Sequence, residues 1–312
     1  MFWVDRVLSK ERLDVLLVER RLCSSRQQAQ RCIRAGEVRV DRAVVDKPGT
    51  EVLRSALVEV TQRPPYVSRG GEKLAKALAE FAIPVRDRIC LDGGISTGGF
   101  TDCLLQAGAK RVYGIDVGYG QLDWQLRNDP RVIVHERTNL RHLQPATLYP
   151  DGVPDADLGV VDVSFISLVK VLPALWRLLR SPREVILLVK PQFEVGRDRV
   201  GKKGVVRNPA DQVAAIVQVL RAATGAVTGA ATSVPPLNWT FCGLTGSPIL
   251  GPAGNIEYLL WLREAQAGTD RVAIPAETDQ PRDWERAIVA PIVAATQAHF
   301  KVSNTLAPDA AG

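Results

Sequence analysis

Strand-like and helix-like segments alternate along the chain from Tyr66 onward, and this alternation constrains the fold more than any other feature. Short apolar runs predict buried strands in RICLDGG, RVYGID, RVIVHE, ADLGVVDVSF and EVILLVK. Helices are predicted in STGGFTDCLLQAG and over 168–179. This spacing predicts an α/β domain with a doubly wound, mostly parallel sheet. Ligands bind such sheets at the carboxyl ends of the strands.

The first 65 residues follow another pattern, which predicts a small α+β module. A first helix is indicated by apolar residues at helical spacing: Leu13, Leu16, Leu17 and Leu22. Ser24 or Ser25 can cap a second helix, which Gly36 ends. The run EVRVDRAVVDKPGTEV then alternates like short strands joined by tight turns.

The domain boundaries follow from these patterns. We expect residues 1–65 to form the small module, 66–268 the α/β domain and 269–312 a C-terminal tail. Within the tail, PAETDQPRD indicates a loose connector, and 283–300 can form a helix despite Pro291.

The positive charge is unevenly distributed. The chain of 312 residues has a net charge of +6, which permits a nucleic-acid partner. Residues 1–65 hold 13 Lys and Arg against 9 Asp and Glu, so four of these charges fall there. Arg26, Arg31 and Arg34 would stand on the outer face of the second helix. A solvated basic face is the alternative to RNA contact.

Several classes of protein are disfavoured. No apolar run reaches the ~18–20 residues needed to span a bilayer, and the N-terminal MFWVDR lacks an apolar signal core. The five cysteines form no C-x-x-C pair, and the three histidines form no ligand pattern. We therefore expect a cytoplasmic protein with reduced thiols, no membrane contact and no metal.

A glycine-rich turn, DGGISTGG, follows the first strand of the α/β domain. Glycines let the backbone approach a ligand, and a helix N-terminus offers free N–H groups. The spacing is neither the dinucleotide G-x-G-x-x-G nor a Walker loop. The candidate cofactor-binding residues in this turn are Asp92, Gly93, Gly94, Ser96, Thr97, Gly98 and Gly99.

An acid at the end of the second strand completes a candidate cofactor site. Asp116 can accept hydrogen bonds from both hydroxyls of a ribose. Because no pyrophosphate fingerprint is present, S-adenosyl-L-methionine fits better than a dinucleotide. Asp92 and the loop N–H groups would hold its methionine end, and Asn139 its adenine edge. A plain tight turn with a solvated Asp, and a capping role for Asn139, remain open.

Four charged residues lie at the edges of elements or within apolar strands. Lys73 follows SRGGE in a helix, Asp162 lies inside the apolar strand VVDVSF, Lys190 ends VILLVK, and Glu257 lies inside GNIEYLLWL. Charged side chains are rarely buried without partners, so these four would neutralise one another if they met. A structural ion network is the alternative interpretation.

The N-terminal module resembles the RNA-binding domain first described in small-subunit ribosomal protein S-four. The matching residues are Arg12, Leu13, Asp14, Ser25, Arg26, Ile33, Gly36, Val38 and Val40. Arg42 stands where that family often has glycine, so the turn there can differ. The resemblance implies that basic residues, here Arg12, Arg26, Arg31 and Arg34, contact RNA phosphates.

The remaining motifs resemble those of the TlyA, or hemolysin A, family of rRNA methyltransferases, whose catalytic domain is similar to FtsJ/RrmJ ribose methyltransferases. The resemblance rests on YVSRGGEKLAKAL, DGGISTGGFTDCLLQAGAKRVYGIDVGYGQL, VVDVSFISL, LLVKPQFEVGRDRVGKKGVVRNP and GPAGNIEYLLWL. It implies a Rossmann-like methyltransferase that uses S-adenosyl-L-methionine to methylate a ribose 2′-hydroxyl, on a cytidine of rRNA in a ribosomal subunit. It also implies a catalytic tetrad of Lys73, Asp162, Lys190 and Glu257.

Within that tetrad, Lys190 is the candidate for taking or orienting the hydroxyl proton, with Lys73 as a neighbouring positive charge. Asp162 and Glu257 would orient the lysines. The loop GRDRVGKKGVVR, residues 196–207, would lie beside this site, and its candidate RNA contacts are Arg197, Lys202 and Lys203. A mobile solvated loop is the alternative there.

Other functions are also considered. One is an RNA-binding protein whose methyltransferase domain is inactive, against which the intact tetrad argues. Another is a membrane-active hemolysin, for which no sufficiently hydrophobic segment is found. The glycine spacing disfavours a nicotinamide dehydrogenase. The sequence does not distinguish the small from the large ribosomal subunit as the substrate.

Overall fold

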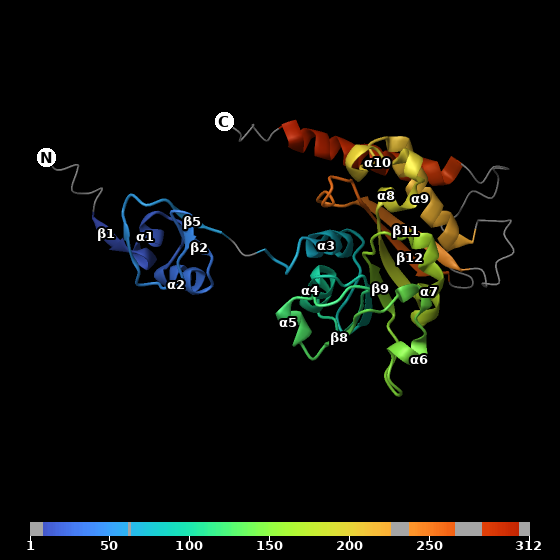
Figure 1. Cartoon of the computed structure of the whole chain (residues 1–312), viewed down its shortest axis with the longest axis horizontal. Helices are drawn as coiled ribbons and strands as arrows, with labels where there is room; N and C mark the ends of the chain where they lie inside the picture. Colours follow the sequence, from blue (N-terminus) through green and yellow to red (C-terminus); the bar gives the residue numbers. More distant parts are fainter. Residues whose placement is uncertain (1–8, 62–63, 226–236, 266–282, 306–312) are drawn as a thin grey trace. The chain divides into compact units, whose positions relative to one another are not determined.

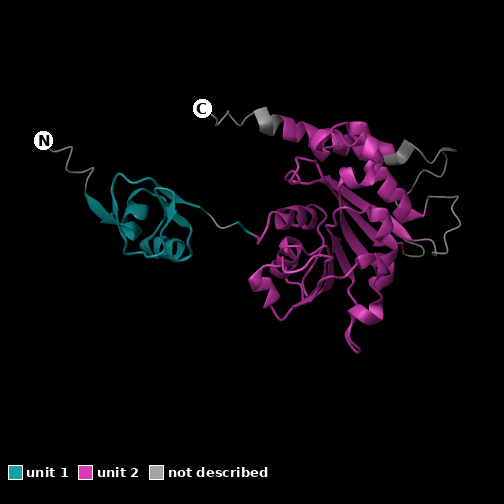
Figure 2. Cartoon of the chain, in the orientation of Figure 1, with its two compact units in different colours: residues 1–65 teal, residues 66–312 magenta. Residues whose placement is uncertain are grey.

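A computed structural model of the chain describes residues 9–61, 64–225, 237–265 and 283–305. The chain forms two compact units, residues 1–65 and residues 66–312 (Figure 2). The N-terminal MFWVDR and residues 275–282 of the predicted connector lie outside the described residues.

The first unit combines two helices with short strands in its described residues (Figure 1). Its elements are β1 (Lys10–Arg12), α1 (Leu13–Glu19), α2 (Arg26–Arg34), β2 (Val38–Val40), β3 (Ala43–Val44), β4 (Glu51–Leu53) and β5 (Val58–Val60). β1 pairs with β4, and β2 pairs with both β3 and β5, all antiparallel. This is the predicted small α+β module.

The helices of this unit begin and end for local reasons. The Ser25 hydroxyl accepts a hydrogen bond from the Gln28 N–H at 3.2 Å and so caps α2, as predicted. Leu22 was expected on the apolar stripe but is exposed. The reason is that α1 ends at Glu19 and Arg21 has a φ of 58°, which turns the chain out of the helix.

The turn between β2 and β3 has the positive φ values that favour glycine, although no glycine is present there. Asp41 and Arg42 have φ values of 48° and 70°. Two residues with positive φ match the right-handed twist of a tight hairpin. Arg42 therefore preserves the turn, at a conformational cost of about 1–2 kcal/mol.

The second unit is built on a seven-stranded sheet with the order β11-β12-β10-β9-β6-β7-β8. The strands are β6 (Ile89–Gly93), β7 (Arg111–Ile115), β8 (Val132–His135), β9 (Leu158–Val161), β10 (Glu184–Val189), β11 (Trp239–Gly246) and β12 (Tyr258–Glu264). β6 to β10 are parallel, whereas β12 runs antiparallel to both β10 and β11. The doubly wound, mostly parallel sheet is confirmed, and β11 is an additional strand that was not predicted.

Helices cover both faces of this sheet (Figure 1). They are α3 (Gly70–Glu80), α4 (Gly99–Gln106), α5 (Trp124–Arg127), α6 (Pro145–Leu148), α7 (Leu172–Leu178), α8 (Pro191–Glu194), α9 (Pro209–Thr224) and α10 (Asp283–Thr305). Four 3₁₀ turns are described: η1 (Leu140–His142), η2 (Leu168–Lys170), η3 (Arg197–Arg199) and η4 (Lys202–Gly204). The helix predicted over 168–179 is divided into η2 and α7, and Pro173 lies in the first turn of α7.

The two faces hold separate apolar cores. Along β10, Val185 and Leu187 face the core formed with α7, α9 and α10, while Ile186 and Leu188 face the core formed with α3 and α4. This period of two is the pattern of a strand covered on both sides. The crevice lies at the carboxyl ends of β6 and β9, where the strand order reverses.

The C-terminal helix α10, which was predicted within the 269–312 tail, packs on the second unit. It begins at the predicted Asp283 and runs past the predicted end to Thr305, with Pro291 inside it. Val289 and Val293 are buried in the core beside α9. The helix also contacts β11, the outermost strand.

Candidate active site

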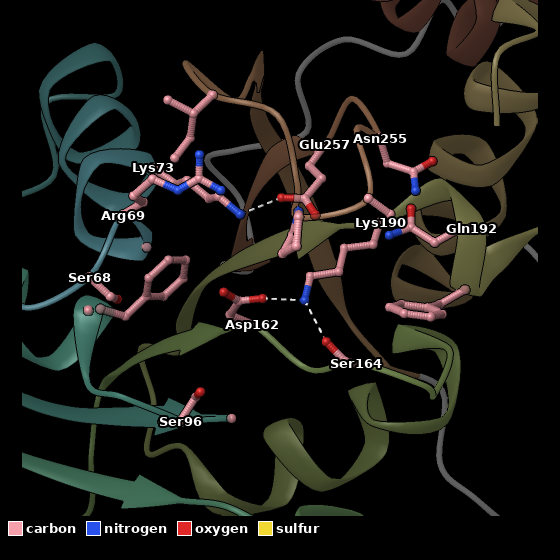
Figure 3. Close-up of a pocket in the computed structure, with 18 of the residues that line it drawn as sticks. Ser68, Arg69, Lys73, Ser96, Asp162, Ser164, Lys190, Gln192, Asn255 and Glu257 are labelled. Atoms are coloured by element: carbon pink, nitrogen blue, oxygen red, sulfur yellow. Dashed lines mark hydrogen bonds and ion pairs between the residues drawn. The ribbon is translucent and has the colours of Figure 1, made fainter. Parts of the chain in front are cut away.

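A pocket of about 810 Å³ opens at the carboxyl edge of the sheet and is lined by all four predicted charged residues (Figure 3). Lys73 comes from α3, Asp162 follows β9, Lys190 follows β10 and Glu257 precedes β12. The two acids therefore lie directly outside their strands, not inside them as their apolar surroundings suggested. Their position at strand ends is what lets them face the pocket.

Each lysine is paired with one acid. Lys73 Nζ lies 2.5 Å from Glu257 Oε2, and these side chains are 8% and 1% exposed. Lys190 Nζ lies 2.6 Å from Asp162 Oδ1 and donates a hydrogen bond to Ser164 Oγ at 2.8 Å. The positive charges are thus offset locally, as buried charges require.

Glu257 is held by a loop with no room for another side chain. The Gly251 N–H donates to the Asn255 carbonyl at 2.9 Å, and the Ser247 N–H donates to the Glu257 carbonyl at 2.8 Å. A Cβ at Gly251 would overlap the Glu257 carboxylate. Glycine is therefore required there for the carboxylate to reach Lys73.

Close packing of α3 on α4 places Lys73 at the pocket. A Cβ at Gly71 would overlap the ring of Tyr66, and one at Gly99 would overlap Ser68. The Cβ at Gly99 would also lie 2.9 Å from the Gly71 nitrogen. These glycines let the two helices approach closely enough to bring Lys73 over the carboxyl edge of the sheet.

Part of the glycine-rich turn faces the pocket, namely Gly94 to Thr97 and Gly99. Gly94 has a φ of 90°, and a Cβ there would lie 2.6 Å from the Asp162 carbonyl oxygen. Gly93 and Gly98 are not among the lining residues and serve packing instead. A Cβ on Gly93 would lie 2.7 Å from Leu140, and Gly98 has a φ of 97° beneath leucine side chains.

Asp92 lies beneath the turn and lines neither the main pocket nor its neighbour. It is fully buried, and its Oδ2 accepts a hydrogen bond from Thr101 Oγ1 at 2.7 Å. Among the described residues, its Oδ1 has no hydrogen-bond partner. Burial raises the pKa of Asp92 to about 7, although the Thr101 hydrogen bond opposes that rise.

A second pocket of about 470 Å³ adjoins the first and holds Asp116 and Asn139. The Asp116 carboxylate accepts hydrogen bonds from the Ser96 N–H at 2.8 Å and the Gly118 N–H at 2.7 Å. Asn139 Oδ1 accepts from the Arg141 N–H at 3.0 Å and caps η1, as its alternative interpretation predicted. Shared lining residues such as Gly94 make the two pockets one continuous cleft.

Comparison with known proteins decides the family. Residues 66–264 match the FtsJ-like methyltransferase model, and residues 11–58 match the S4 domain. The chain is 48% identical over 256 residues to the 16S/23S rRNA (cytidine-2′-O)-methyltransferase TlyA of Mycobacterium tuberculosis, which covers 81% of this chain and 90% of the relative. The chain belongs to the TlyA family of FtsJ-like methyltransferases.

Other members of the TlyA family agree. A candidate rRNA methyltransferase of Bacillus subtilis, YqxC, is 48% identical over 270 residues, 86% of this chain and 91% of the relative. A solved structure of a candidate hemolysin from Streptococcus thermophilus is 37% identical, with a TM-score of 0.65, and covers 96% of this chain and 99% of the other.

The predicted resemblance to the TlyA family is therefore confirmed, with its S4 domain and methyltransferase activity class. The alternatives of an inactive domain, a dehydrogenase or a lytic protein are not favoured. In the part of the chain that the structure describes, no helix is both long and apolar enough to cross a bilayer.

Several lining residues of this TlyA-family pocket were missed in the sequence. They include Arg69, Ser164, Phe165, Gln192 and Asn255. Phe165 has a φ of 65°, is 92% exposed and packs against Phe193, with ring centroids 5.3 Å apart. A local signal existed for Ser164 and Phe165, which directly follow the Asp162 motif. No local pattern indicates Gln192 or Asn255.

The basic loop, residues 196–207, borders the pocket. Its η3 and η4 turns leave Arg197, Lys202 and Lys203 exposed, while Val200 and Gly204 line the pocket wall. The candidate RNA contacts of this loop therefore lie within a few residues of the pocket.

The predicted RNA-binding arginines of the first unit fall into two groups. Arg31 and Arg34 are exposed on α2. Arg12 and Arg26 are also exposed, but each donates to the buried Asp14, at 3.0 and 2.9 Å. Burial would raise the pKa of Asp14, yet hydrogen bonds from Arg12, Gln30 and Arg26 hold it well below its usual range.

Proposed function

We propose that this chain transfers a methyl group from S-adenosyl-L-methionine to a ribose 2′-hydroxyl, on a cytidine of ribosomal RNA in a cytoplasmic ribosomal subunit. The observation that supports this most is the pairing of Lys73 with Glu257 and of Lys190 with Asp162 in one pocket. The M. tuberculosis relative is named for cytidine 2′-O-methylation of 16S and 23S rRNA.

The cleft has the donors and acceptors that this cofactor needs. Asp116 would accept the ribose hydroxyls, since each carboxylate oxygen can accept more than the one hydrogen bond it already has. The turn at Gly94 and Ser96 would hold the methionine end by its backbone, and Asn139 would line the adenine pocket. Asp92 would support the turn from below. When bound, S-adenosyl-L-methionine supplies an electrophilic sulfonium methyl group.

The charged residues would act on the ribose. A 2′-hydroxyl is a weak nucleophile and must lose its proton as it attacks. In this proposal Lys190 passes its ammonium proton to the paired Asp162 carboxylate and, as the neutral amine, orients the hydroxyl and takes up its proton while the methyl group leaves the sulfonium. Asp162 and Ser164 hold the Lys190 Nζ in place. The Lys73–Glu257 pair fixes the other wall of the pocket. Alignment of the reacting groups supplies much of the rate.

RNA would be held by charges outside the pocket. In the S4 domain these are Arg31 and Arg34, with Arg12 and Arg26 contributing from their Asp14 pairs. In the catalytic unit they are Arg197, Lys202 and Lys203. Phosphate contacts of this kind supply affinity and register but little sequence information.

Methyl transfer to isolated subunits tests the proposal. Small and large subunits that lack the modification are incubated separately with labelled S-adenosyl-L-methionine and the full-length protein. Incorporation at a cytidine 2′-oxygen is expected with the wild type and with Lys110→Ala, an exposed lysine away from the pocket. In Lys190→Ala the rate of methyl incorporation is expected to fall at least about 100-fold. Equal incorporation by Lys190→Ala, or none by the wild type, would contradict the proposal.

A further inference from the structure

One buried side chain joins the basic loop to the strand that follows Glu257. Gln212, on α9, is 1% exposed. Its Nε2 donates to the Val206 carbonyl at 2.8 Å, and its Oε1 accepts from Tyr258 Oη at 2.6 Å. Val206 belongs to the basic loop, and Tyr258 directly follows Glu257 in the chain. Gln212 therefore bridges the proposed RNA contact and the catalytic pocket.

Asn255 makes a second connection between the same two segments. It is 1% exposed, lines the pocket and precedes Glu257 by two residues. Its Oδ1 accepts from the Val206 N–H at 2.9 Å, and its Nδ2 donates to the Gly204 carbonyl at 2.8 Å. Both polar groups of the Val206 backbone are thus bound by side chains that are linked to the segment around Glu257.

Helix α10 supports the Gln212 connection from outside the match to the FtsJ-like methyltransferase model, which ends at residue 264. Gln297 Nε2 lies 3.1 Å from Gln212 Oε1 and 3.3 Å from the Arg207 carbonyl, and donates to both. The helix therefore supports the amide of Gln212 in the orientation that bridges Val206 and Tyr258.

We propose that Gln212 is a positioning residue that couples RNA contact at the basic loop to the Glu257–Lys73 ion pair. The network of Gln212, Asn255, Val206 and Tyr258 is called the Gln212 latch. Buried hydrogen bonds are costly to leave unmade, so a latch with every partner in place favours one arrangement.

The coupling has a direction. Lys202 and Lys203 are exposed on the loop side of the latch, and Glu257 lies on the pocket side. A phosphate that holds these lysines holds Val206, and through Gln212 and Asn255 it steadies Glu257 against Lys73. RNA contact would then raise the rate of transfer as well as the affinity. The RNA part of this inference rests on the proposed function.

A tyrosine pair gives a matched test. Tyr258→Phe removes the Tyr258–Gln212 bond of the latch, while Gln212 Oε1 keeps its hydrogen bond from Gln297 and Asn255 keeps its bonds to the loop. Tyr149→Phe is the control, because Tyr149 is also buried and its hydroxyl donates a hydrogen bond to the Leu178 carbonyl at 2.8 Å, away from the latch. At saturating subunits, Tyr258→Phe is expected to lower kcat about 3- to 10-fold with KM unchanged, and Tyr149→Phe less than about twofold. Equal effects of the two variants would overturn the proposal.

Loop variants separate coupling from a structural role. In the wild type, Lys202→Ala with Lys203→Ala is expected to raise KM and also to lower kcat. In the Tyr258→Phe background the same pair is expected to raise KM but to lower kcat less than in the wild type, because the connection through Gln212 is already broken and only the one through Asn255 remains. If the loop substitutions and Tyr258→Phe lowered kcat additively, Tyr258 would only stabilise the fold, and the proposed coupling would be overturned.

Hydrogen exchange tests the latch without RNA or activity. The Val206 amide donates to Asn255 Oδ1, and Gln212 holds the carbonyl of the same residue. Because Gln212 loses its Tyr258 partner in Tyr258→Phe, it should hold Val206 less firmly there, and the Val206 amide should exchange at least about 5-fold faster than in the wild type or Tyr149→Phe. Unchanged exchange in Tyr258→Phe would overturn the latch even if the wild type is active. If the wild type methylates no subunit but exchange accelerates as expected, the proposed function fails and the latch stands.

Discussion

Lys73 and Glu257 are 184 positions apart in the chain, yet their charged atoms lie 2.5 Å apart in a buried ion pair. One residue comes from the first helix of the catalytic unit and the other precedes its last strand. The pair therefore links the two ends of this unit at the pocket wall.

Breaking this pair should cost stability as well as activity. Glu257→Ala leaves the Lys73 ammonium buried without its partner, so the free energy of unfolding should fall by about 3–5 kcal/mol. Replacing both, as Lys73→Met with Glu257→Leu, should restore most of that stability and still abolish methyl transfer. Denaturant unfolding and methyl incorporation measure the two effects. A double variant with wild-type activity would show that the pair is only structural.

Gly251 offers a gentler way to displace the same carboxylate. In Gly251→Ala the new methyl group must push the Glu257 carboxylate away, because it would overlap it. We expect kcat to fall at least about 10-fold, since a misplacement of about 1 Å can cost far more. Gly152→Ala is the control, because it has open space and only its φ of 77° to strain. It should lose about 1 kcal/mol of stability and no activity.

Asp92 should make the cofactor-free protein less stable as pH rises. Burial raises its folded-state pKa to about 7, from an ordinary value near 3.8. Between these values the folded state keeps a proton that the unfolded state has lost, so the free energy of unfolding falls with rising pH. Asp92→Asn should remove this pH dependence. The free energy of unfolding of the variant, relative to that of the wild type, should therefore be higher at pH 8 than at pH 5. Parallel curves for the two proteins would contradict the assignment.

Substitution of different arginines of the S4 domain should affect RNA binding and stability to different extents. Arg31→Ala with Arg34→Ala should weaken rRNA binding and reduce the salt slope by about 2, because each phosphate contact contributes about one unit. Arg26→Ala should also lower stability, because it removes a partner of the buried Asp14. Arg86→Ala, an exposed arginine in the other unit, is the control. Titrations at several salt concentrations would show an unchanged slope if α2 does not contact RNA.

The strands that carry the site were predictable because they are buried on both faces. VILLV in β10, residues 185–189, is a continuous apolar run that alternates between two cores. Lys190 stands out because it ends that run. The same argument failed for β11, WTFCGLTG, where small and polar residues obscure the period. At Gly243 the strand changes register, and a Cβ there would overlap the ring of Phe81.

The partners within the site were not predictable. The sequence indicated that two lysines and two acids would neutralise one another, but which pairs form depends on the close packing of α3 on α4. Asp92 was expected to contact the cofactor directly, and it instead lies beneath the turn. Gln212 and Asn255 carry no local signal, because their partners lie in other segments of the fold.

The position of β12 has a consequence for synthesis. It is the last strand among the described residues, but it lies between β10 and β11, so β11 has no neighbour in the sheet until β12 inserts. Glu257 arrives with that insertion. A growing polypeptide therefore has no complete pocket until nearly the whole catalytic unit has left the exit tunnel. If ribosomal RNA is the substrate, we expect a chain that has not yet released Glu257 from the exit tunnel to be unable to methylate the ribosome that is making it.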